Sequence, residues 1–177
     1  MVNLTDEVIL QPPEPVITAE RHYTPEMLEC ISKVFGERGR NLALSKPCQI
    51  TIKGPSRTFC NFATKEVRTV MNNKDWIHSV PAVIHEFAHR YVNVFFMDIA
   101  VDAPNENHEA CAIFAELVLA QECPHHGLQV MERMSIIREH PYAYYRKAVL
   151  VVDYELQRNA KGHIHAMMRR LINARTH

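Results

Sequence analysis

Hydrophobic residues recur every three or four positions between residues 23 and 39, a spacing that predicts an amphipathic helix. Thr24 suits the N-cap of this helix, and Pro25 occupies its first position, where a missing N–H costs nothing. The preceding segment, about residues 1–20, contains three prolines between positions 9 and 20. Prolines at this density favour an extended arm over a helix or a central strand.

The hydrophobic pattern changes after residue 47 to three short segments rich in β-branched and aromatic residues, at 48–53, 57–63 and 66–72. Gly54-Pro55 and a turn at 63–65 separate them, so we expect strands, the last two paired as a hairpin. We also expect the strand at 66–72 to be an exposed edge, able to hold an extended peptide through main-chain hydrogen bonds.

Helical spacing returns in the second half of the chain. It predicts a helix at 78–97, with Ser79 as cap and Pro81 in the first turn, then a loop at 98–107. Further helices are predicted at 107–121, 127–139, 141–162 and 163–174. The predicted fold class is α+β: one domain over residues 1–177, with a small, mostly antiparallel sheet packed on the helix at 78–97 and additional C-terminal helices.

Composition limits the possible partners and compartment. Lys plus Arg and Asp plus Glu number 20 each, so no net field attracts nucleic acid, and the arginines at 169, 170 and 175 are interpreted as a solvated helix end. No secretory signal or membrane-length apolar run is present, so we expect a cytoplasmic protein with no membrane partner. The five cysteines include no CxxC pair, which argues for reduced, mostly buried thiols rather than disulfides or a zinc ribbon.

The helix predicted at 78–97 contains His85, Glu86 and His89 within an otherwise apolar stretch. Residues four apart share a helix face, so His85 and His89 can present ring nitrogens to one tetrahedral zinc ion. Glu86 lies about 100° round the helix, where its carboxylate can act as general base toward a zinc-activated water. The HExxH form also arises by chance, but burying three ionisable groups without a partner costs several kcal/mol, and a metal removes that cost.

On these residues the chain resembles the zincin metallopeptidases, over roughly residues 50–120. The resemblance implies a zinc metallopeptidase with one Zn²⁺ per chain and a peptide or protein substrate, with an endopeptidase favoured over an exopeptidase. The metzincin branch requires Gly and His where this chain has Val92 and Phe95. The gluzincin branch takes its third ligand from a following helix, and Glu109 follows His89 after 19 residues, as in thermolysin-like enzymes.

Three other residues compete with Glu109 for the third ligand position. His108 would make a three-histidine site of SprT-like type, and Glu106 and Glu116 are the remaining rivals. Thermolysin-like enzymes carry an aspartate four residues after the ligand glutamate, but this chain has Ile113 there, so support for a ligand histidine must come from elsewhere. A non-catalytic zinc-containing binding or regulatory module and a non-peptidase hydrolase stay as alternative functions.

Other polar residues give weaker signals. Peptide hydrolysis benefits from a donor that faces the developing oxyanion. The segment 140–146 offers five candidates: His140, Tyr142, Tyr144, Tyr145 and Arg146. The pairs His125-His126 and His163/His165 are interpreted as surface residues, because neighbours one or two apart on a helix do not share a face.

Overall fold

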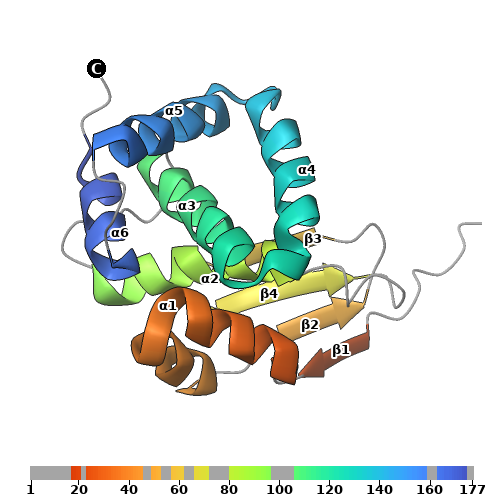
Figure 1. The fold of residues 1–177 in the computed structure, drawn as a ribbon. Coiled ribbons are helices and arrows are strands. Elements are labelled where there is room, and N and C mark those ends of the chain that lie inside the picture. Colours follow the sequence, from red (N-terminus) through yellow and green to blue (C-terminus); the bar gives the residue numbers. More distant parts are fainter. Residues whose placement is uncertain are drawn as a thin grey trace, which may run out of the picture.

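The structure of the protein is a computed structural model (Figure 1). It describes the backbone of residues 17–20, 23–45, 49–52, 57–61, 66–71, 80–96, 106–158 and 163–174. Side chains are described for residues 23–45, 80–96, 106–157 and 163–174. Ser79 and most of the loop predicted at 98–107 lie outside these ranges. So does the predicted N-terminal arm as far as residue 16.

The helices account for most of the described chain. They are α1 (Pro25–Ser45), α2 (Val80–Phe95), α3 (Glu106–Glu122), the short 3₁₀ helix η2 (Pro124–His126), α4 (Gly127–Arg138), α5 (Ala143–Arg158) and α6 (Ile164–Ile172). The cap predicted for α1 is confirmed, because the Met27 backbone N–H donates to Thr24 Oγ1 at 3.2 Å. The α1 helix is kinked at Gly36, which has φ 68° and ψ −162°.

The α3 helix lies at the centre of the helical body and contacts α1, α2, α4, α5 and α6 (Figure 1). Every residue from 108 to 116 is buried, so α3 is enclosed on all sides rather than along one stripe. Asn107 ties the start of α3 to the end of α6, since its Nδ2 donates to the carbonyl oxygens of Ile172 at 3.1 Å and Ala174 at 2.8 Å. The core is therefore built from helices packed around a buried helix.

Four short strands lie along one side of the helical body: β1 (Ile17–Glu20), β2 (Gln49–Ile52), β3 (Arg57–Asn61) and β4 (Glu66–Met71). Their order is β1-β2-β4-β3. The β1 and β2 strands pair antiparallel, as do β3 and β4, whereas β2 and β4 run parallel. Both β3 and β4 contact α2, which places this sheet beside the helix that carries the HExxH residues.

The predicted fold class, an α+β zincin-like domain with a small sheet packed on the HExxH helix, is wrong. The part of the chain with described side chains is 89% helical and contains no strand, so the protein is a helical one. The strands are four to six residues long, whereas the six α-helices run from 9 to 21 residues. Among the residues with described side chains, the helices bury their apolar surface against α3 and one another.

The expectation of an exposed edge strand at 66–72 is also wrong. The β4 strand pairs with β2 on one side and β3 on the other, so its main-chain groups face neighbouring strands on both sides. Residues 17–20, expected in the extended arm, form β1 and pair with β2. Local sequence pattern does not report which strand occupies the middle of a sheet.

Two further findings concern the apolar length of the helices and the cysteines. No helix among the described residues is long and apolar enough to cross a membrane. Cys30, Cys111 and Cys123 are buried free thiols, which agrees with the expectation for these three, while the side chains of Cys48 and Cys60 lie outside the described set.

The kink in α1 gives a prediction about stability. Gly36→Ala should lower the free energy of unfolding by about 1–3 kcal/mol, because a backbone with φ 68° and ψ −162° strains any residue with a Cβ. The added methyl group would meet no atom within 4 Å, so the loss would come from backbone strain alone. Chemical denaturation measures it.

Gly127→Ala is the matched control for this substitution. Gly127 has φ −58° and ψ −42°, and open space surrounds the position of its missing Cβ. This variant should be unchanged or more stable by up to about 1 kcal/mol. Equal losses in the two variants would contradict the strain assigned to Gly36.

Candidate metal centre

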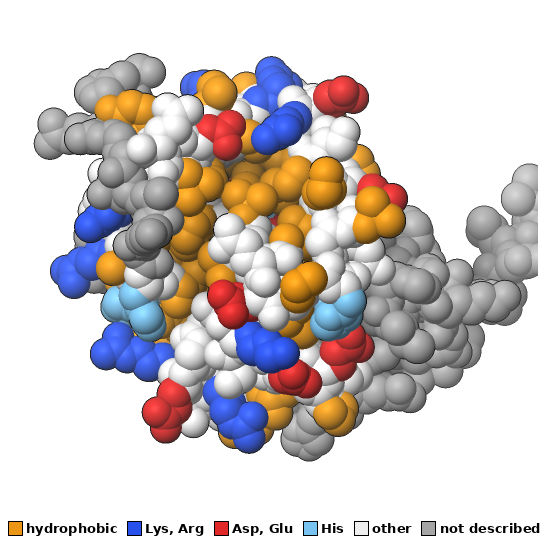
Figure 2. All heavy atoms as spheres, in the orientation of Figure 1, with side chains coloured by type: hydrophobic (Ala, Val, Ile, Leu, Met, Phe, Trp, Pro, Cys, Tyr) orange, Lys and Arg blue, Asp and Glu red, His pale blue; other side chains and the backbone are white. Residues whose placement is uncertain are grey.

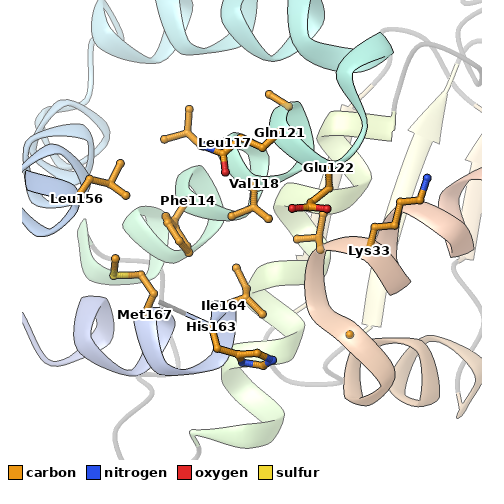
Figure 3. Close-up of a pocket in the computed structure, with 13 residues that line it drawn as sticks. Lys33, Phe114, Leu117, Val118, Gln121, Glu122, Leu156, His163, Ile164 and Met167 are labelled. Atoms are coloured by element: carbon orange, nitrogen blue, oxygen red, sulfur yellow. The ribbon is translucent and has the colours of Figure 1, made fainter. Parts of the chain in front are cut away.

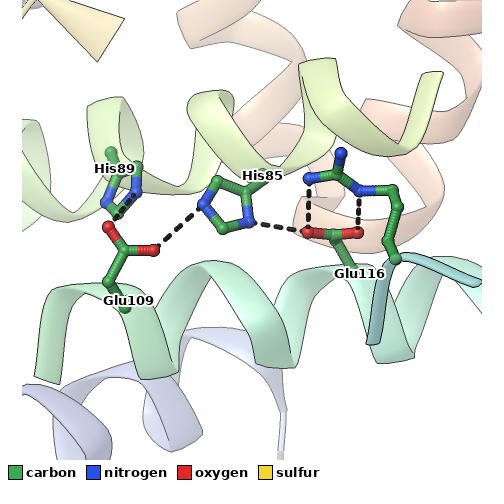
Figure 4. Close-up of polar contacts among 5 residues, drawn as sticks. His85, His89, Glu109 and Glu116 are labelled. Carbon is green, nitrogen blue, oxygen red and sulfur yellow. Dashed lines mark hydrogen bonds and ion pairs between the residues drawn. The ribbon is translucent and has the colours of Figure 1, made fainter. Parts of the chain in front are cut away.

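Helices α2 and α3 pack together and bring the histidines of one against the glutamates of the other (Figure 4). His85 and His89 lie one turn apart on α2, with ring centroids 5.1 Å apart. Another face of α2 is fixed by aromatic packing, because Phe87 and Tyr91 lie 5.0 and 5.2 Å from Phe35 of α1 between ring centroids. Packing on α1 therefore fixes the rotation of α2 that turns both histidines toward α3.

Three of the residues singled out in the sequence converge on one point. His85 Nε2 lies 3.1 Å from Glu109 Oε2, and His89 Nε2 lies 3.4 Å from Glu109 Oε1 (Figure 4). One ligand atom from each residue lies within 4.8 Å of the other two, and all three residues are buried. Two imidazoles and a carboxylate at this spacing match the donor set of a catalytic zinc site with a fourth position left for water.

Glu116 lies two turns after Glu109 on α3 and approaches the other side of the His85 ring. Its Oε1 accepts from His85 Nδ1 at 2.6 Å, and its side chain is fully buried. Arg133 of α4 holds this carboxylate from the far side, donating from Nε at 2.6 Å and from Nη2 at 3.1 Å. When Nε2 loses its proton to a metal and Nδ1 keeps its own on Glu116, the Nε2 electron pair is directed toward Glu109, as a metal ligand requires.

The charges of this cluster shift the pKa of its members strongly. Burial alone would lower the pKa of His85, but hydrogen bonds to Glu109 and Glu116 raise it to about 10. Burial would raise the pKa of Glu109, yet the neighbouring His89 and His85 hold it well below the usual range. Arg133 and His85 likewise lower the pKa of Glu116 against the effect of burial. Without a metal, His85 is therefore an imidazolium held between two carboxylates.

The rivals for the third ligand position lie differently. His108 is fully buried and stacks on His89, with ring centroids 5.8 Å apart, and it is not one of the three convergent ligands. Burial, followed by the charge of His89, lowers the pKa of His108 to about 4, which keeps its ring neutral. Glu106 is half-buried in the first turn of α3 and also stays outside the convergent set.

Glu86 follows His85 on α2, and Tyr145 of α5 interacts electrostatically with Glu86 and Glu109. Glu86 is half-buried, so its carboxylate is more accessible than the side chains of His85, His89 and Glu109. Burial raises the pKa of Tyr145 on α5, as do the negative charge of Glu109 and a side-chain hydrogen bond with Tyr144, with a smaller contribution from Glu86.

The other oxyanion candidates of segment 140–146 are engaged elsewhere or exposed. Arg146 donates to the carbonyl oxygens of His140 and Pro141, and Tyr142 is 63% exposed. His140 accepts from the Tyr142 backbone N–H at 3.2 Å, and the Tyr144 ring stacks 4.3 Å from that of Tyr145. Among the five, Tyr145 interacts electrostatically with Glu109 and Glu86.

A separate cavity of about 710 Å³ lies between α1, α3, α5 and α6 (Figure 3). Phe114, Val118, Ile164 and Met167 line it with apolar surface, and Figure 2 shows hydrophobic side chains gathered in the hollow framed by these helices. None of its lining residues belongs to the cluster around His85, because Phe114 and Val118 occupy a different face of α3 from Glu109 and Glu116.

Comparison with known proteins adds no relative. No family model matches the sequence, and no curated protein or solved structure matches it. The interpretation of the site therefore depends on its geometry and chemistry.

Sequence reasoning found His85, Glu86, His89 and Glu109 but left the role of Glu116 open and missed Arg133. Glu116 is a charged residue inside the apolar run 110–120, two turns from Glu109, and this pattern could have indicated its role. Nothing in the sequence indicated Arg133, since its partner lies 17 residues away on another helix.

The raised pKa of His85 predicts how zinc binding responds to pH. At pH 7–9 the metal-free His85 carries a proton, because its pKa is about 10. Zinc binding at Nε2 should release that proton, so apparent affinity should rise roughly tenfold per pH unit across this range. Calorimetric titration in buffers of different ionisation enthalpy measures the protons released.

Glu116→Gln separates this effect from other proton sources. The amide keeps the shape of the side chain but removes one of the charges that raise the pKa of His85. Proton release at pH 8 should fall, and zinc affinity should drop about 10- to 100-fold. Glu132→Gln, on the exposed side of α4, should match the wild type, and an unchanged proton count in Glu116→Gln would contradict the prediction.

Proposed function

We propose that the protein is a zinc-dependent metallopeptidase, with His85, His89 and Glu109 as zinc ligands and Glu86 as general base. The observation that supports this most strongly is the convergence of the three ligand atoms within 4.8 Å inside a buried helix pair. The Glu116 carboxylate on His85 Nδ1 supports it further, because ligand histidines usually donate their second N–H to such a group.

Zinc, when bound at this centre, would supply a Lewis acid that polarises the scissile carbonyl and acidifies the attacking water. The chain's own residues would transfer the proton and hold the His85 ring in position. Glu86 adjoins His85 and is only half-buried, so its carboxylate can accept the proton of the water and deliver it to the leaving amine. The Arg133–Glu116–His85 chain of contacts would hold the His85 ring in place throughout.

Tyr145 is the proposed donor to the oxyanion that forms as the water attacks. Its raised pKa keeps the phenol protonated across the physiological range, so the O–H can donate a hydrogen bond as charge develops. The electrostatic coupling to both Glu109 and Glu86 is what favours this tyrosine over its neighbours.

The proposed substrate is a peptide or protein, and the proposed compartment is the cytoplasm. Free, buried Cys30, Cys111 and Cys123 support a reducing compartment, although they do not identify it. A non-catalytic zinc module is the competing function, and the deep burial of His85, His89 and Glu109 is the observation in its favour, since structural zinc sites are closed.

Glu86→Gln tests the catalytic assignment. The amide keeps the size and hydrogen bonding of the side chain but cannot take a proton, so hydrolysis of an unstructured protein should fall by about 10²- to 10⁴-fold. Zinc content should equal that of the wild type, because Glu86 is not a ligand. Full activity in this variant would remove Glu86 as base, and an inactive wild type that retains zinc would favour the non-catalytic module.

Tyr145→Phe tests the oxyanion donor. Removing one hydroxyl should lower kcat by about 10²- to 10³-fold and leave KM and zinc content close to wild type, since the hydrogen bond forms only in the transition state. Tyr142→Phe, at an exposed position nearby, should retain wild-type kinetics. A kcat unchanged in Tyr145→Phe would exclude this role.

A further inference from the structure

A second group of potential metal ligands lies where the start of α1 meets η2. Glu26 belongs to the first turn of α1, and His125 and His126 end η2. Glu26 Oε1 lies 3.2 Å from His125 Nε2 and 3.1 Å from His126 Nε2. One ligand atom from each of the three residues lies within 4.8 Å of the others, and none of these residues belongs to the His85 centre.

The two histidines meet although they are adjacent in sequence. Neighbours in a regular helix point apart, but His126 ends η2 and is also the N-cap residue of α4, so the regular spacing is interrupted there. Their ring centroids lie 4.1 Å apart. The expectation that both are surface residues is wrong for His126, whose side chain is 6% exposed. The other pair divides similarly: His163 is exposed, and His165 is half-buried beside Tyr91.

The Nε2 atom of the buried His126 ring makes no hydrogen bond. The ring Nδ1 lies 3.4 Å from Gln129 Oε1, so the tautomer with the ring proton on Nδ1 can donate to that acceptor. The buried Nε2 makes no hydrogen bond of acceptable geometry, yet it lies 3.1 Å from Glu26 Oε1. In a neutral ring this puts a nitrogen electron pair against a carboxylate oxygen. A cation between the two atoms turns that repulsion into coordination.

The spacing and the chemistry of the three donors fit a transition metal. Ligands about 2.0–2.1 Å from a tetrahedral zinc ion are separated by about 3.3 Å, close to the distances between Glu26 Oε1 and the two ring nitrogens. Two imidazoles and one carboxylate suit zinc and exclude calcium or magnesium, which take oxygen ligands. The side chains of His125 and Glu26 are 62% and 47% exposed, so an ion and a water ligand have access from solvent.

We infer that Glu26, His125 and His126 form a second zinc-binding site, independent of the proposed peptidase centre, that fastens the first turn of α1 to the start of α4. This site adds a zinc to the one expected from the HExxH motif. Its position matters because α4 carries Arg133, whose side chain holds Glu116 against His85. Zinc binding here should stabilise the folded chain, since the unfolded chain does not hold the three ligands together.

Zinc itself is the probe for the test. In the full-length wild type, competition with a chromophoric chelator should count one more zinc per chain than in Glu26→Gln or His125→Ala. The affinity lost should exceed the roughly 10- to 100-fold that removal of an outer hydrogen-bond partner costs. Both substitutions are at exposed side chains, so folding should be preserved, which circular dichroism checks. His126→Ala should give the same loss but removes a buried ring.

Two controls make the result specific. Glu29→Gln removes another carboxylate of α1, one that pairs with Lys33. This variant should keep the wild-type zinc count. The double variant His85→Ala/His89→Ala should still bind one zinc, and adding Glu26→Gln to it should abolish that binding. This result does not depend on whether the His85 centre is a peptidase site. Equal zinc counts in the wild type and in folded Glu26→Gln and His125→Ala would overturn the second site.

Discussion

The contact between His85 and Glu116 is the interaction on which the geometry of the candidate site depends. A fully buried carboxylate costs several kcal/mol unless it is paired, and Glu116 is paired twice, with His85 of α2 and Arg133 of α4. These contacts fix the relative positions of three helices and leave His85 Nε2 directed toward Glu109. The same polar network therefore satisfies the buried charges of the core and orients a potential ligand.

The helical core and the polar cluster share the same residues of α3. Ala110, Cys111 and Ala112 are small and fully buried, which allows other helices to approach α3 closely. Glu109 and Glu116 extend from one face of this helix toward α2, while Phe114 and Val118 line the apolar cavity on another. Because α3 is enclosed by α1, α2, α4, α5 and α6, its carboxylates have little freedom to move away from the histidines.

The two histidine–glutamate groups differ in what holds them. At the His85 centre the side chains are buried, and Glu116 and Arg133 orient one ring from behind. At the α1–η2 junction two of the three side chains are open to solvent, and one hydrogen bond to Gln129 orients His126. The first arrangement suits chemistry that needs fixed groups, and the second suits an ion that joins two helices at the surface.

The sequence by itself determined the helices and the HExxH residues, because periodicity and i, i+4 spacing are local properties of a chain. Thr24 and Pro25 likewise marked the start of α1. Tertiary structure alone decided the predominance of the helical core, the central place of β4 and the meeting of Glu26 with His126. It also decided that Arg133 reaches Glu116. These features depend on which distant segments pack together, and that choice is made by burial and charge pairing across the whole fold rather than by any local pattern.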